Sequence, residues 1–177
     1  MVDEALADYV ESSLSELIKK NDNIIVVRSF SKLFGLASLR IGYLVASKNI
    51  INLIRKISSP FSVNGIAQEL AIEALQDKEH IKESINYVNA EKEILIKELE
   101  EIGFQCTKSS TTNFLVNIEQ LGNPKQAVTK LLDKGILVTE ASFFKVLENK
   151  YIRISVSLRE ENKYFIKVMR ELALNHT

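Results

Sequence analysis

Several residue types are scarce in this chain, and each scarcity excludes a kind of site, linker or binding partner. A single cysteine among 177 residues excludes an intrachain disulfide framework and a cysteine-built zinc site. Two prolines and six glycines leave no low-complexity linker between domains. Lysine plus arginine equals aspartate plus glutamate at 23 each, so bulk charge provides no attraction to nucleic acid or to an anionic membrane.

Long hydrophobic runs are also missing. No apolar run approaches the roughly 18 residues that a membrane-spanning helix requires, and residues 1–4 do not resemble a signal peptide. Together with the lone Cys106, these features predict a protein of the reducing cytoplasm. The length is sufficient for a sizeable core, in one domain or in two small ones.

The stretch from Ile24 to Ala46 has the clearest pattern in the chain. Four consecutive β-branched aliphatic residues open it, at 24–27. Such a short apolar run, bounded by polar residues, predicts a strand buried on both faces. A second apolar strand is predicted over 39–46, so the polar residues between the two strands lie in a connection.

That connection contains Ser29, Ser31 and Lys32, with Arg40 eight residues after the lysine. A lysine enclosed by apolar and small residues is costly to keep charged, and a neutral amine is a nucleophile for carbonyl carbon. The two hydroxyls and the guanidinium are suited to a phosphate dianion. The alternative interpretation, a lysine at a strand end and an arginine in a surface ion pair, would suffice for an isolated Ser-Lys pair.

The full string from Ser29 to Gly42 reads SFSKLFGLASLRIG and resembles the cofactor-lysine motif of fold-type I aminotransferases, which use pyridoxal phosphate (PLP). Their pattern is Ser/Thr-x-Ser-Lys-x-Phe/Tyr-Gly/Ala-x-Ala-Gly-x-Arg-x-Gly. Only Ser38 departs from it, where glycine is usual. Within the family, the resemblance is greatest to histidinol-phosphate aminotransferases.

The resemblance extends to the first residues of the chain. Asp3 stands 29 residues before Lys32, where the family carries the aspartate that pairs with the pyridine nitrogen of PLP. A carboxylate there keeps the nitrogen protonated, and the protonated ring withdraws electrons from the substrate. The family often places a tyrosine where this chain has Leu6, which cannot donate a hydrogen bond; Tyr9 follows three residues later.

Arg153 lies in the alternating segment 151–157, which predicts a half-buried strand. Side chains on a strand alternate between faces, so Arg153 is expected to project with Tyr151 and Ser155. In the resembling family, an arginine at this place grips an anionic group of the substrate; the alternative is an arginine on the solvent face of an edge strand. Histidinol-phosphate enzymes commonly have a further arginine where this chain has Thr139, which argues against histidinol phosphate itself.

Hydrophobic periodicity and turn residues predict the remaining elements. Helices are predicted over 5–19, 50–57, 62–76, 78–101, 124–134 and 160–175, and further strands over 104–107, 113–118 and 136–139. With the resemblance, they indicate an α/β fold: the C-terminal part of a PLP-binding large domain with an incomplete sheet over 1–90, then a small α+β domain over 91–177. Complete enzymes of the family are longer, so the chain is expected to be a C-terminal fragment that is inactive by itself.

The resemblance implies a PLP-dependent aminotransferase of amino-acid biosynthesis, moving an amino group between an amino acid or amino-alcohol phosphate and a 2-oxo acid. It assigns Lys32 as the catalytic Schiff-base lysine, Arg153 to substrate binding, and the cofactor contacts to Asp3, Ser29, Ser31, Lys32 and Arg40. At full length it implies a homodimer, with no metal, nucleic acid or membrane partner. A PLP-dependent decarboxylase of the threonine-phosphate type and a non-catalytic domain that lost the cofactor stay open as alternatives.

Overall fold

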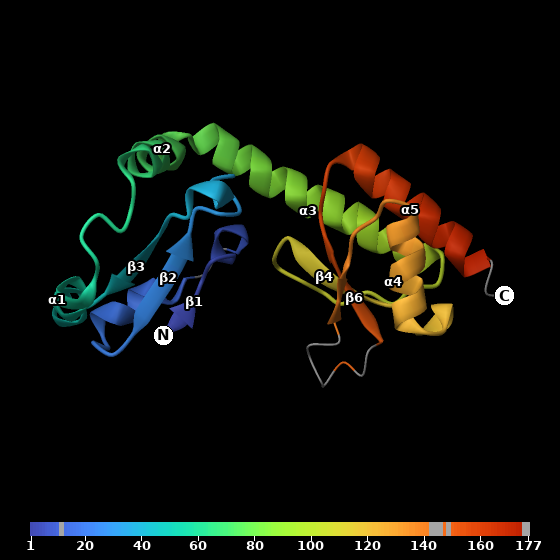
Figure 1. Cartoon of the computed structure of the whole chain (residues 1–177), viewed down its shortest axis with the longest axis horizontal. Coiled ribbons are helices and arrows are strands. Elements are labelled where there is room, and N and C mark those ends of the chain that lie inside the picture. Colours follow the sequence, from blue (N-terminus) through green and yellow to red (C-terminus); the bar gives the residue numbers. More distant parts are fainter. Residues whose placement is uncertain (11–12, 142–146, 148–149, 175–177) are drawn as a thin grey trace. The chain divides into compact units, whose positions relative to one another are not determined.

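The computed structural model describes residues 1–10, 13–141, 147 and 150–174 (Figure 1). Two compact units divide the chain, Met1–Ile85 and Asn86–Thr177, and the long helix α3 (Lys78–Glu101) contains the boundary. The predicted bounds of this helix are confirmed. No helix in the described ranges has the length and apolar character needed to span a membrane.

The first unit is built on a three-stranded sheet with the order β1-β2-β3. Its strands are β1 (Val2–Asp3), β2 (Ile25–Ser29) and β3 (Gly42–Ala46). The first two run parallel and the third is antiparallel to β2. The carboxyl ends of β1 and β2 therefore lie at the same edge of the sheet as the beginning of β3.

Both predicted strands of the central stretch exist, with shifted bounds. Only Val26 is fully buried in β2, and its neighbours are partly exposed, so the prediction of a strand buried on both faces is wrong. The second strand begins at Gly42 because residues 37–39 form a 3₁₀ turn and Arg40 adopts a left-handed conformation. The chain therefore changes direction before it enters the sheet.

The predicted helix over 5–19 is wrong within the described residues. Two short 3₁₀ helices occupy this region, Ala7–Tyr9 and Leu14–Lys19. The Glu4 carboxylate accepts hydrogen bonds from the Leu14 N–H and the Ser13 hydroxyl. Such side-chain contacts compete with the backbone bonds of a continuous α-helix.

The two following helices are confirmed as α1 (Lys48–Ile57) and α2 (Gly65–Gln76). The Asn64 side chain caps α2 by accepting the N–H of Ala67 at 2.8 Å. Ala67 and Ala71 are buried with Phe30 and Ile41 in the core of this unit. The larger apolar residues of this helix, Ile66 and Leu70, are exposed, because the small core of this unit reaches only the alanines.

The second unit combines an antiparallel sheet with helices, as the predicted α+β pattern requires. Its strands follow the order β4-β6-β5. They are β4 (Asn113–Asn117), β5 (Thr139–Glu140) and β6 (Tyr151–Ser155), and the helices after α3 are α4 (Pro124–Asp133) and α5 (Arg159–Leu174). The predicted strand over 104–107 is reduced to an isolated bridge between Cys106 and Val116. Of the strand predicted over 136–139, only Thr139 belongs to a strand, β5.

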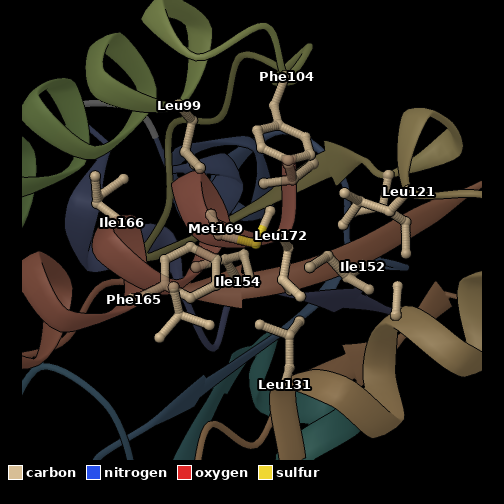
Figure 2. Packing of buried hydrophobic residues seen from close by; sticks show 14 of the residues in the cluster. Leu99, Phe104, Leu121, Leu131, Ile152, Ile154, Phe165, Ile166, Met169 and Leu172 are labelled. Carbon is tan, nitrogen blue, oxygen red and sulfur yellow. The ribbon is translucent and has the colours of Figure 1, made fainter. Parts of the chain in front are cut away.

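The core of the second unit lies between one face of its sheet and the helices. Figure 2 shows Leu99 of α3, Leu131 of α4 and Met169 of α5 packing around Ile152 and Ile154 of β6. Tyr151, Arg153 and Ser155 alternate with these buried isoleucines and are half-buried or exposed. The predicted alternation of β6 is thus confirmed.

A buried polar cluster joins α3 to the beginning of α5. The carboxylate of Glu91, which is only 2% exposed, accepts a hydrogen bond from Arg159 Nε at 2.7 Å and from Asn162 Nδ2 at 3.0 Å. Asn162 also exchanges hydrogen bonds with the backbone of Ser157. Burial by itself raises the pKa of Glu91, but these hydrogen bonds and the charge of Arg159 outweigh it and hold the pKa below the usual 4.5.

This lowered pKa predicts an acid-sensitive contribution to stability. A carboxylate with a lower pKa in the folded state stabilises the fold above pH 4.5, and the contribution is lost as pH falls through the folded value. We expect the difference in the free energy of unfolding between the wild type and Glu91→Gln, measured by urea denaturation at about pH 7 and about pH 3, to shrink in acid. Glu93→Gln, at an exposed site on the same helix, is the control and is expected to show no such change. An unchanged difference for Glu91→Gln would contradict the prediction.

Candidate active site

The topology of the first sheet brings four of the predicted site residues to one edge. Asp3 is the last residue of β1 and Ser29 the last of β2, while Arg40 stands just before β3. Lys32 follows β2 by three residues. Because parallel strands end at the same edge and an antiparallel strand begins there, an acid, a hydroxyl, an amine and a guanidinium share this edge.

Hydrophobic anchors fix the connection that carries Lys32. Phe30 and Leu33 are each 4% exposed, and the Phe30 ring lies 4.9 Å from that of Phe34. The Lys32 carbonyl accepts the N–H of Gly35 at 3.0 Å, in a turn where Gly35 has a φ of 68°. The Lys32 side chain is exposed, so the prediction of an enclosed lysine is wrong for this chain: its apolar neighbours turn inward and the amine turns outward.

The predicted phosphate-binding groups flank this lysine. The Ser29 hydroxyl accepts the N–H of Ser31 at 3.1 Å, which folds the chain tightly before Lys32. Arg40 is exposed and donates from Nη1 to the carbonyl of Ala37 at 2.7 Å. Its φ of 51° is costly for a residue with a side chain, and such strain is concentrated at functional sites.

The structure explains why position 42, the last glycine of the sequence motif, has no side chain. A Cβ placed on it would lie 2.6 Å from the carbonyl oxygen of Arg28 on the neighbouring strand. That distance is well inside van der Waals contact, so a side chain would force β2 and β3 apart. The glycine therefore allows β3 to pair with the end of β2, where Ser29 stands opposite Gly42.

A largely buried ionic cluster involves residues next to this edge, Glu4 after β1 and Arg28 in β2, and the sequence interpretation missed it. Arg28 donates from Nε to Glu4 at 3.0 Å and from Nη1 to Asp8 at 2.7 Å. Exposure of these three side chains is only 16%, 7% and 13%, respectively. Arg28 directly follows the four aliphatic residues 24–27, and Glu4 directly follows Asp3. A charge at the end of an apolar run, within the same strand, was the available signal.

The two acids of this cluster respond differently to burial. For Glu4, burial raises the pKa, but hydrogen bonds from Leu14, Ser13 and Arg28 outweigh it, so the net pKa is lowered. For Asp8, burial outweighs the attraction of Arg28, so the pKa is raised. Arg28 thus contacts two carboxylates, Glu4 directly after β1 and Asp8 in the 3₁₀ helix that follows, and the cluster ties β1 to β2 beside Asp3 and Ser29.

His80 also contacts the lysine-bearing connection. It is exposed, and its Nε2 lies 3.4 Å from the carbonyl oxygen of Leu33. Ser84, one turn further along α3, lies 3.3 Å from the same nitrogen. The start of α3 thus supports the connection immediately after Lys32.

Arg153 belongs to the second unit. Its guanidinium is exposed, and Nη2 donates to Thr139 Oγ1 at 3.4 Å. It lines a cavity of about 670 Å³ within that unit.

Burial raises the pKa of the Cys106 thiol to about 12, which removes it as a nucleophile near neutral pH. Within the described ranges, no group of three or more histidine, cysteine, aspartate or glutamate residues could hold a metal ion.

Comparison with known proteins identifies the protein family that has this fold. Residues 1–169 match the family model for aminotransferase class I and II. The chain therefore belongs to the aminotransferase class I and II family, as the motif from Ser29 to Gly42 predicted.

Individual relatives show which members of the family this chain is similar to. Histidinol-phosphate aminotransferase 2 of Archaeoglobus fulgidus is 38% identical over 172 residues, covering 97% of this chain and 49% of the relative. The structure of L-threonine-O-3-phosphate decarboxylase from Porphyromonas gingivalis matches with a TM-score of 0.83 and 28% identity, over 96% of this chain and 53% of that one. The structure of histidinol-phosphate aminotransferase from Sinorhizobium meliloti, solved in complex with pyridoxal-5'-phosphate, shares the fold with a TM-score of 0.87 at 24% identity. The match covers 99% of this chain and 48% of that one. The chain thus spans about half the length of the relatives it matches.

Proposed function

We propose that this chain is the C-terminal part of a PLP-dependent aminotransferase similar to histidinol-phosphate aminotransferases. The whole protein would transfer an amino group between an amino acid or amino-alcohol phosphate and a 2-oxo acid. One observation carries the proposal: Asp3, Ser29, Lys32 and Arg40 converge on one sheet edge, in a chain that matches the family over 1–169.

The groups at this edge fit the chemistry of the cofactor. PLP, when bound, withdraws electrons from the α-carbon of an amino substrate. The Asp3 carboxylate is exposed and suits a protonated ring nitrogen. The hydroxyls of Ser29 and Ser31 and the guanidinium of Arg40 suit a phosphate dianion, which an arginine binds in fork geometry.

Lys32 has two roles in this proposal. Its exposed side-chain amine would hold the cofactor covalently, because an amine condenses with an aldehyde carbon and the aldehyde oxygen leaves as water. The same nitrogen, when free, would take the proton from the substrate α-carbon as a general base and return it as a general acid. The buried anchors Phe30 and Leu33 keep the backbone of this residue in place during both steps.

Arg153 is proposed to hold an anionic group of the substrate. It projects from β6 on the face opposite Ile152 and Ile154, and Thr139 is its neighbour on β5. A planar guanidinium binds a carboxylate or a phosphate through two hydrogen bonds. In the whole protein, residues 1–90 would contribute to the PLP-binding domain and 91–177 would form the small domain of each subunit of a homodimer.

Addition of PLP to the whole protein that carries this sequence tests the proposal. We expect a visible absorbance band that disappears on reduction with borohydride, and an adduct located by mass spectrometry on the peptide that contains Lys32. The isolated 177-residue chain, titrated in parallel, shows how much of the binding this part supports. If the whole protein binds no PLP, the non-catalytic alternative is correct instead.

A decarboxylase of the threonine-phosphate type is the second candidate. The 28% identity to L-threonine-O-3-phosphate decarboxylase favours it, as does Thr139 where histidinol-phosphate enzymes commonly have an arginine. The bond that breaks depends on which substituent of the α-carbon is aligned over the cofactor. Incubation with histidinol phosphate plus 2-oxoglutarate, and separately with threonine phosphate, distinguishes amino transfer from release of carbon dioxide.

A further inference from the structure

A second cavity beside Arg153, of about 340 Å³, contains another cation. Lys108, Ser109 and Asn113 line this cavity together with Arg153, and none of the described residues that line it is an aspartate or a glutamate. Two positive side chains without an acid give a cavity a positive potential, which attracts anions. This cavity is therefore a candidate site for an anionic group.

Hydrogen bonds fix the chain on both sides of Lys108. Thr107 donates its N–H to the Leu115 carbonyl at 2.9 Å, and the Thr107 hydroxyl accepts the Leu115 N–H at 3.0 Å. On the other side, the Ser109 hydroxyl accepts the N–H of Thr111 at 3.1 Å. The backbone of Lys108 therefore belongs to a folded loop that leads into β4.

This loop is also held from the interior by a buried amine. Lys92 of α3 is only 7% exposed, and its Nζ donates to the Thr111 carbonyl at 2.9 Å. The neighbouring Thr112 carbonyl accepts the N–H of Val156, which directly follows β6, at 2.9 Å. These bonds hold the loop against the strand that carries Arg153. The two cations therefore need little rearrangement to bind one ligand, which lowers the cost of binding.

The hydrogen-bond donors at this cavity are available to a ligand. The exposed side chain of Lys108 forms no hydrogen bond or ion pair with the described part of the chain. Among the described residues, the Arg153 guanidinium donates only to Thr139, at 3.4 Å. Asn113 accepts the Ser155 hydroxyl through Oδ1, which leaves its Nδ2 group to donate. An ammonium, a guanidinium and an amide can thus donate to one anion.

We propose that Lys108 and Arg153 together bind the phosphomonoester group of a substrate, and that Lys108 is the residue that selects this dianion over a carboxylate. The inference rests on the proposed role of Arg153 in substrate binding and adds a second cation to it. One guanidinium satisfies the two oxygens of a carboxylate. A phosphomonoester has three terminal oxygens and a charge of about −1.5 to −2 near pH 7, so it also gains from the ammonium of Lys108 and the amide of Asn113.

Chemical labelling of the whole protein that carries this sequence tests the proposal without PLP or turnover. Acetic anhydride modifies exposed lysines, phenylglyoxal modifies exposed arginines, and mass spectrometry gives the rate at each residue. The probes are methyl phosphate and acetate. We expect methyl phosphate to slow the modification of both Lys108 and Arg153, and acetate to slow that of Arg153 alone. Lys167, an exposed lysine of α5, is the internal control and should react at the same rate with either probe present.

Variants at position 108 show whether the charge of this residue selects the ligand. Affinities follow from how the protection of Arg153 depends on probe concentration. We expect Lys108→Gln to weaken binding of methyl phosphate about fivefold, the effect of one exposed ion pair, and to leave binding of acetate unchanged. Lys108→Arg, which keeps the charge, and Lys167→Gln, the matched control, are expected to bind methyl phosphate nearly as the wild type does.

Three outcomes would overturn the proposal: no protection of Lys108 by methyl phosphate, equal protection of Lys108 by acetate, or wild-type affinity of Lys108→Gln for methyl phosphate. Failure of PLP to attach to Lys32 would instead refute the proposed function. Because the labelling requires no PLP, it decides the role of Lys108 in either case.

Discussion

Replacement of Lys32 by alanine is expected to abolish the borohydride-stable attachment of PLP to the whole protein and to end measurable turnover. In the proposed function, Lys32 supplies both the covalent link and the proton transfer at the substrate α-carbon. Loss of the acid–base role alone reduces a rate by about 10²–10⁴-fold, and loss of the nucleophile adds to it. The measurements are mass spectrometry of the reduced protein and an assay of amino transfer.

Lys56→Ala is the matched control, since Lys56 is another exposed lysine of the first unit, on α1. It is expected to retain both attachment and turnover. Circular dichroism of the Lys32→Ala protein should match that of the wild type, because the Lys32 side chain is exposed and supports no packing. Retained PLP attachment and retained turnover in Lys32→Ala would show that another amine performs these roles.

Replacement of Arg28 by alanine is expected to destabilise the first unit by about 3–5 kcal/mol, the usual cost of removing one partner of a buried ion pair. The carboxylates of Glu4 and Asp8, 7% and 13% exposed, would lose the cation that both contact. Because whole domains are stable by only about 5–15 kcal/mol, this loss would leave the unit largely unfolded under mild denaturant. Urea denaturation of the 177-residue chain, followed by circular dichroism, measures it.

The control for Arg28 is Arg55→Ala, at an exposed position on α1, which we expect to change the free energy of unfolding by less than about 0.5 kcal/mol. Amide exchange assigns the loss to the first unit, since only its residues should exchange faster. A double replacement of Glu4 by glutamine and Arg28 by methionine removes the cation and one of its two carboxylates, and it is expected to recover part of the stability. A change below about 1 kcal/mol for Arg28→Ala would mean that the cluster acts as a surface ion pair.

Much of the local structure was readable from the chain. Asparagine is a favoured N-cap residue, and Asn64 and Asn123 each accept a backbone N–H at the beginning of a helix. The stripe of apolar residues at helical spacing predicted α3 with its correct bounds. The alternation from Tyr151 to Ser155 predicted which residues of β6 are buried. These features depend on neighbours in sequence, so a single sequence contains them.

Predictions failed where distant residues compete with a local pattern. The apolar spacing over 5–19 predicted a helix, but the Glu4 carboxylate accepts hydrogen bonds from the Leu14 N–H and from Arg28. These contacts favour a different local backbone. The apolar face of α2 was expected inside, but the core of the first unit contacts only its alanines. Thr139 and Arg153 were singled out separately, and the pairing of β5 with β6 is what joins them.

The sequence by itself determined the family and the identity of the chemical groups, because the motif from Ser29 to Gly42 fixes their order and spacing along the backbone. Only the tertiary structure decided that Asp3 meets this motif at one sheet edge, that Lys32 faces outward, and that a buried Arg28 holds β1 against β2. The physical reason is that strand pairing and the burial of charge join residues far apart in the chain, and neither leaves a periodic signal in the sequence.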